Sequence, residues 1–79
     1  MKFNVIVTYK QDILDPQGKT IQHSIEMLGY SEVKEVRSGK FFQVEIDCKS
    51  VDEGKSILEE VSRKLLANPN IETFKVEKE

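Results

Sequence analysis

The stretch Asp15-Pro16-Gln17-Gly18 constrains the fold of this chain more than any other feature, because it marks where a strand gives way to a helix. Before it, residues 3–9 alternate with the two-residue period of a strand. The Asp15 side chain can accept from the free N–H groups of a first helical turn, and Pro16 loses nothing at the first helical position. An apolar stripe at helical spacing follows, formed by Ile21, Ile25 and Leu28. Gly29 is then suited to end the helix.

The rest of the chain predicts a hairpin, a second helix and a closing strand. Residues 33–37 and 41–48 are predicted as strands, and Ser38-Gly39 supplies the glycine that a tight turn needs for positive φ. Ser50 and Glu53 form a capping box. The helix that follows is expected to bury one stripe of residues: Ile57, Leu58, Val61 and Leu65. Asn68-Pro69 ends this helix, and residues 71–77 form the last strand.

The order strand, helix, strand, strand, helix, strand predicts an α+β fold of the ferredoxin-like β-α-β-β-α-β type. This two-layer sandwich has a four-stranded antiparallel sheet with both helices on one face. Seventy-nine residues predict a single domain over residues 1–79. The face under the helices takes Val5, Val7, Phe42, Val44, Ile46, Phe74 and Val76. The bare face shows three large apolar groups that suit docking: Ile6, Phe41 and Ile71.

Composition narrows the possible partners. A chain this short buries only about 60% of the surface that its unfolded form exposes, and oligomerisation is a common way to add stability. The net charge of −2 argues against nucleic-acid binding, which needs a basic face. A single cysteine, Cys48, suits a reducing compartment, and no apolar run approaches the roughly 18 residues of a membrane span. We expect a cytoplasmic protein that is not bound to a membrane.

No set of residues in the chain forms a catalytic or metal site. His23, the only histidine, falls on the helix side opposite Ile21, and no acidic or cysteine partner stands at ligand spacing. We expect it to face solvent. Cys48 continues the inward stripe of its strand and is expected to act as a small core residue. Gly18-Lys19-Thr20 lacks the spacing of a phosphate loop.

The basic segment Arg37-Ser38-Gly39-Lys40-Phe41 allows two interpretations. Two cations beside a glycine turn and an outward aromatic ring could grip a phosphate, a carboxylate or an acidic protein surface. Alternatively, the charges protect a hairpin from pairing with another sheet edge. An RNA-recognition strand fits poorly, because Gln43 and Glu45 share the face of Phe41 and the chain is acidic.

The residues quoted above resemble those of one known family. The D-P-Q-G stretch that leads into a helix, combined with V-R-x-G-K at residues 36–40, is similar to the PurS family. The resemblance extends through Leu28-Gly29-Tyr30 and the capped second helix to Asn68-Pro69-Asn70-Ile71-Glu72, and so covers essentially the whole chain. PurS is the small subunit of phosphoribosylformylglycinamidine synthase, a ligase of purine biosynthesis.

The resemblance implies a function for the chain. The complete enzyme uses ATP and glutamine to convert FGAR into FGAM. A PurL-type synthetase subunit binds ATP and magnesium, and a PurQ-type glutaminase releases ammonia. The PurS-type subunit is implied to be non-catalytic and to bind no cofactor. It is implied to form a homodimer or higher homo-oligomer and to assemble the other two subunits so that ammonia passes between them.

We expect partner contacts at the basic segment and at the helix entry: Arg37, Gly39, Lys40, Phe41, Asp15 and Gln17. One alternative is a regulatory module of ferredoxin-like fold that binds a small metabolite at its dimer interface. That function needs a glycine-bearing ligand loop, whereas Gly18 falls inside the first helical turn. Another is an acylphosphatase-like enzyme, which needs an arginine and an asparagine; residues 10–16 contain no arginine and no asparagine.

Overall fold

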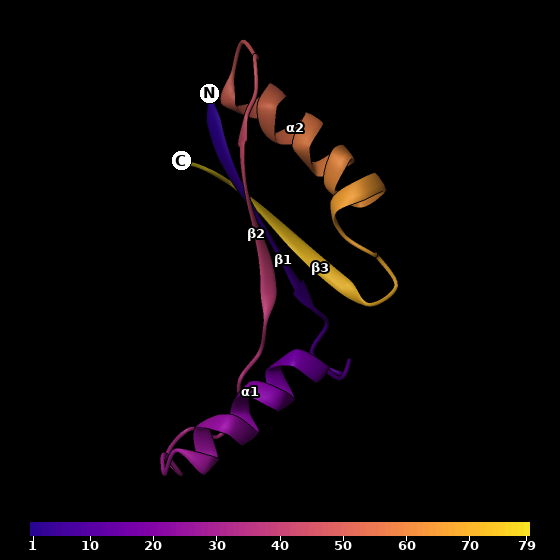
Figure 1. The fold of residues 1–79 in the computed structure, drawn as a ribbon. Coiled ribbons are helices and arrows are strands. Elements are labelled where there is room, and N and C mark those ends of the chain that lie inside the picture. Colours follow the sequence, from indigo (N-terminus) through magenta and orange to yellow (C-terminus); the bar gives the residue numbers. More distant parts are fainter.

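The computed structural model describes residues 1–79 as an elongated molecule with two parts (Figure 1). Its Cα radius of gyration is 15.8 Å and its extents are 50 × 25 × 14 Å. A compact domain of this length would have a radius of gyration of about 12 Å. One part is a sheet with a helix against it. The other is a helical arm that extends away from the sheet.

The sheet has three antiparallel strands in the order β2-β1-β3, with β1 at Lys2–Tyr9, β2 at Gly39–Glu45 and β3 at Glu72–Lys78. Val5 of β1 lies opposite Phe42 of β2 and Val76 of β3, so these residues share one face. Ile6 and Phe41 pair on the other face. The predicted division of the apolar residues between the two faces of the sheet is therefore confirmed for these strands.

Helix α2, at Val51–Val61, covers part of the inner face and continues into a π-helical turn at Ser62–Leu66. Its start has the serine half of the predicted capping box, because the Ser50 hydroxyl accepts from the Glu53 N–H at 3.1 Å. The core combines both elements: Phe3, Val5, Val7, Leu58, Ala67 and Val76. The predicted burial of the α2 stripe is confirmed for Leu58 but is wrong for Ile57, which is 40% exposed, and for Leu65, which is 78% exposed. The wider π-helical turn rotates Leu65 away from the sheet and buries Ser62 instead.

Helix α1, at Pro16–Met27, forms where the sequence predicts it but lies elsewhere in space. Asp15 caps its first turn, and Gly29 follows it with a φ of +98°, both as expected. However, α1 does not pack on the sheet or on α2 (Figure 1). We define the arm as α1 together with residues 28–37. The prediction that both helices cover one face is wrong.

The predicted four-stranded sheet is also wrong, and the reason lies at residues 33–38. This segment forms no strand; it runs beside α1, where the Gln22 side-chain amide donates to the Lys34 carbonyl at 2.9 Å. It then leads directly into β2 (Figure 1). Gly29 is the only residue with positive φ, so Ser38-Gly39 does not make the expected hairpin turn. The α+β class is confirmed, with two helices and three strands.

Candidate functional site

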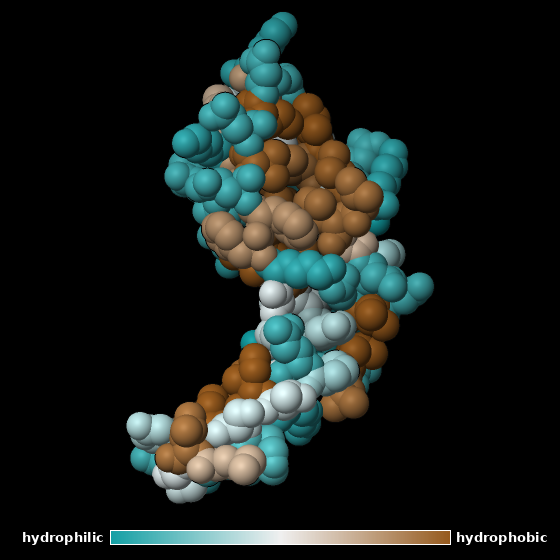
Figure 2. Space-filling view, in the orientation of Figure 1, coloured by the Kyte–Doolittle hydropathy of each residue, from teal (hydrophilic) through white to brown (hydrophobic).

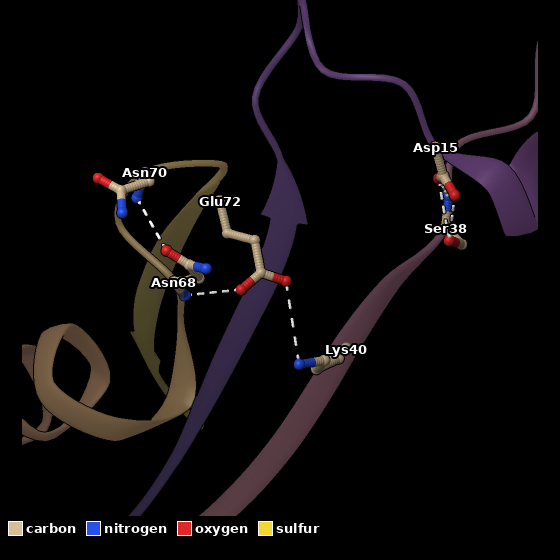
Figure 3. Close-up of polar contacts among 6 residues, drawn as sticks. All are labelled: Asp15, Ser38, Lys40, Asn68, Asn70 and Glu72. Carbon is tan, nitrogen blue, oxygen red and sulfur yellow. Dashed lines mark hydrogen bonds and ion pairs between the residues drawn. The ribbon is translucent and has the colours of Figure 1, made fainter.

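The most highly connected polar group of the chain is the Asp15 carboxylate, at the junction between the sheet and the arm (Figure 3). It accepts from the Gly18 N–H at 2.9 Å, from the Ser38 hydroxyl at 2.8 Å, and from the Ser38 N–H. Asp15 is only 2% exposed. Hydrogen bonds from the backbone N–H groups of Gly18 and Ser38, supported by the charge of Arg37, lower the pKa of Asp15. We call this arrangement the clasp.

Two glycines allow the chain to pass closely through the same junction. A Cβ atom on Gly18 would lie 2.2 Å from the Val36 carbonyl oxygen, and one on Gly39 would lie 2.6 Å from the Val7 carbonyl oxygen. Both glycines are therefore required by close approach of backbone to backbone. The Arg37 guanidinium adds a further tie by donating to the Lys10 carbonyl at 2.9 Å. The two sequence motifs thus form one structural unit.

A second polar group stands at the edge of the inner sheet face. The Glu72 carboxylate accepts from the Asn68 N–H at 2.7 Å, and its other oxygen lies 3.9 Å from Lys40 Nζ (Figure 3). A cavity of about 60 Å³ opens here, lined by Val7, Tyr9, Gln17, Ser38, Gly39, Lys40 and Glu72. This volume has room for only a few water molecules. A nucleotide site needs about 300 Å³ or more, so this cavity is too small to bind one.

The residues proposed to contact partners differ in how available they are. Asp15 has its carboxylate fully engaged within the chain, whereas Gln17, Arg37 and Lys40 are exposed. Phe41 is 63% exposed and lies beside Ile6 on the bare face of the sheet. Gly39 is held against β1 by its pairing with Thr8. Partner contact by these residues stays a prediction.

Sequence reasoning missed two exposed apolar surfaces, because it expected α1 to cover the inner face of its own sheet. On the arm, Met27 is 77% exposed, Leu28 75% and Tyr30 58%. On the inner face, the region without a helix leaves Phe42 and Val44 only partly buried. Figure 2 shows hydrophobic residues gathered between β2 and α2, and a second group along α1. Each surface has the shape and chemistry that a closed sandwich would bury.

Other predicted features are where the sequence places them. His23 is exposed on α1, and Cys48 is partly buried against the core. The structure brings no three His, Cys, Asp or Glu side chains together in a way that could hold a metal ion. Neither of the two α-helices combines the length and the apolar character that a membrane crossing requires.

Comparisons with known proteins assign the fold. Residues 2–79 match the family model PurS, described as phosphoribosylformylglycinamidine (FGAM) synthase. The chain belongs to the PurS family. It is 40% identical over 78 residues to the phosphoribosylformylglycinamidine synthase subunit PurS of Bacillus subtilis, which covers 99% of this chain and 92% of that protein. The subunit PurS of Methanocaldococcus jannaschii is 36% identical over 78 residues, covering 99% and 94%.

Solved structures of the family share the elongated arrangement. The crystal structure of Methanocaldococcus jannaschii PurS matches with a TM-score of 0.88 at 36% identity, covering 96% of this chain and 92% of that one. A structure of PurLQS from Thermotoga maritima contains a chain that matches with a TM-score of 0.87 at 29% identity, covering 96% and 93%. Each superposition covers 96% of this chain and therefore includes the arm, so the position of the arm agrees with these structures.

Proposed function

We propose that this chain is the small subunit of a phosphoribosylformylglycinamidine synthase complex in purine biosynthesis. The complex is a glutamine-dependent ligase that converts FGAR, ATP and glutamine into FGAM, ADP, phosphate and glutamate. The observation that carries the proposal is the PurS family match over residues 2–79. The relative from Methanocaldococcus jannaschii is described as one of the subunits of formylglycinamide ribonucleotide amidotransferase in the purine biosynthetic pathway.

The proposed role is assembly. The structural relative in PurLQS from Thermotoga maritima supports partners of the PurL and PurQ types. Ammonia released by the glutaminase must reach the synthetase before it is lost to solvent, so a subunit that holds the two sites together raises the yield of glutamine-driven turnover. In this proposal the chain supplies no catalytic residue and no cofactor site. ATP and magnesium belong to the PurL-type subunit, and the complex works in the cytoplasm.

The surface of the chain supports a homodimer as the unit that binds these partners. A compact monomer of 9.1 kDa would expose about 4,900 Å², whereas this chain exposes 5865 Å². The excess of about 1,000 Å² is close to the roughly 800 Å² per partner that a stable interface buries. A second copy of the chain would cover it.

The arrangement of that dimer follows from the two exposed apolar surfaces. The inner sheet face beside α2 lacks the helix that its own sequence order places there, and α1 lacks a face to cover. Two copies related by a two-fold axis satisfy both needs when α1 of each packs between β2 and α2 of the other. Each half of the dimer would then contain the two helices predicted for one face.

Reconstitution with purified PurL-type and PurQ-type subunits tests the function. We expect glutamine-driven FGAM formation to require this chain, and ammonium-driven formation to proceed largely without it. Unchanged glutamine-driven turnover in its absence would contradict the assembly role. A binding measurement with purine-pathway nucleotides then tests the metabolite-sensing alternative.

A further inference from the structure

The arm joins the sheet through two segments, residues 10–15 after β1 and residues 36–38 before β2, and one side chain connects them. Ser38 directly precedes Gly39, and Gly39 is fixed to the sheet because it pairs with Thr8 of β1. Asp15 is the N-cap of α1, and its carboxylate accepts hydrogen bonds from both the N–H and the hydroxyl of Ser38. The carboxylate therefore connects the first turn of the arm to the first residue before β2. No other side chain bonds to both.

The backbone around the clasp is extended where a closed fold needs a turn. Residues 36–39 pass between the first turn of α1 and the end of β1, at the two close approaches of Gly18 and Gly39. Gly39 does not use positive φ. The Arg37 bond to the Lys10 carbonyl holds the same segment from the sheet side. A hairpin at Ser38-Gly39 would require this segment to reverse direction and break these ties.

We propose that the clasp commits the chain to pairing with a second copy, by holding residues 36–39 extended so that the arm cannot fold back onto its own sheet. This inference rests on the homodimer of the proposed function. The apolar contacts of α1 with a sheet face are nearly the same within one chain or between two, so the connecting segment decides between them. Asp15 acts as the positioning residue of this segment.

Closure within one chain has an inherent advantage that the clasp must overcome. Two copies lose translational and rotational freedom when they pair, and a closed monomer does not. Release of the clasp breaks the hydrogen bonds that the Asp15 carboxylate accepts from the Ser38 N–H and hydroxyl, while Ser38-Gly39 retains a sequence suited to a hairpin turn. Without the clasp, the closed monomer is favoured at low protein concentration.

Two variants and one control test this inference. Asp15→Asn keeps the size of the side chain but removes its charge, and Asp12→Asn makes the same change at an exposed neighbour for which no hydrogen bond is found. Insertion of Gly-Asn-Gly between Ser38 and Gly39 lengthens the hinge and changes no existing side chain. Light scattering after size exclusion measures mass, X-ray scattering measures the radius of gyration, and circular dichroism checks folding.

We expect wild type and Asp12→Asn to be dimers with a radius of gyration of about 15 Å, as for a compact body of twice the length. The insertion variant should form compact monomers with a radius of gyration of about 12 Å. Asp15→Asn should raise the dimer dissociation constant by about tenfold or more. A merely structural role for Asp15 would lower the melting temperature of Asp15→Asn without changing its dimer dissociation constant.

The outcomes separate the two proposals. If the insertion variant stays a dimer with the dissociation constant of wild type, the clasp inference is wrong, even where Asp15→Asn fails to fold. If wild type is itself a monomer across the concentrations of the assay, the homodimer is wrong and the clasp inference fails with it. Glutamine-driven turnover of the reconstituted complex, measured with wild type, tests the assembly function separately.

Discussion

Leu28→Ala should leave the protomer intact and weaken the dimer, because Leu28 lies on the apolar stripe of the arm with Ile21 and Ile25. Leu28 is 75% exposed in the single chain, so its side chain contributes little to folding. Truncation to alanine removes three carbons, worth about 2.4 kcal/mol when fully buried. Three quarters of this, about 2 kcal/mol, is available only on pairing. Two-fold symmetry doubles it to about 4 kcal/mol, or about a thousandfold in the dissociation constant.

Analytical ultracentrifugation measures this constant, and Glu26→Ala is the matched control. Glu26 is exposed on another side of α1, two residues before the C-cap residue Leu28, and it is likewise replaced by alanine. We expect the control to dissociate within about twofold of wild type, because exposed surface changes away from contacts are nearly neutral. A Leu28→Ala dimer as tight as the control would refute the packing of α1 against a second copy.

Three further predictions test the core, the clasp and the partner surface. Gly54→Ala should destabilise the chain by about 1 kcal/mol and lower the melting temperature by about 4–8 °C, because the new Cβ would lie 2.6 Å from the buried Phe3 ring. This clash outweighs the better helix propensity of alanine. The control Ser56→Ala, at an exposed position of α2, should leave the melting temperature unchanged. The pKa of Asp15 lies below its ordinary value near 3.8. The ionised carboxylate therefore stabilises the fold fully above that pH, and this stability is lost as the pH falls through the lowered pKa. Acid unfolding of Asp15→Asn should lack this loss, and an acid unfolding profile equal to that of wild type would contradict the role of the clasp. Phe41→Ala should speed dissociation from the PurL-type subunit, whereas Lys40→Ala should mainly slow association and reduce its salt dependence. Surface plasmon resonance measures both rates. If both variants bind as wild type does, this surface does not contact the PurL-type subunit.

Local sequence signals predicted both helices, their caps and three of the four proposed strands, since the physical causes of these features are local. The caps at Asp15 and Ser50 satisfy free N–H groups within their own first turns, and both form as expected. The two-residue period of β1 places Val5 and Val7 in the core for the same reason that any half-buried strand alternates. Gly29 ends its helix with positive φ. None of these features depends on where the element lies in the molecule.

The candidate site could be predicted only in part, because its residues serve contacts that are distant in sequence. Gly39 suggested a turn, yet its lack of a side chain is needed for the approach to the Val7 carbonyl. Asp15 suggested a cap, which is correct, but its second partner Ser38 is 23 residues away. Two signals could have indicated the clasp. One is that the Asp15 carboxylate can accept more hydrogen bonds than a helix cap uses. The other is that a glycine follows closely after each of Asp15 and Arg37, namely Gly18 and Gly39.

The position of α1 is a feature that sequence periodicity does not determine. An apolar stripe such as Ile21, Ile25 and Leu28 shows that a helix will be covered, but not which molecule covers it. The same stripe and the same sheet face are compatible with a closed monomer and with a reciprocal pair, and the two differ chiefly in a few residues of connecting backbone. In this chain those residues are held extended by a buried carboxylate. In this proposal the hydrogen bonds at the hinge therefore select which sheet face the arm covers, whereas the apolar surfaces that the hinge directs supply most of the strength of pairing.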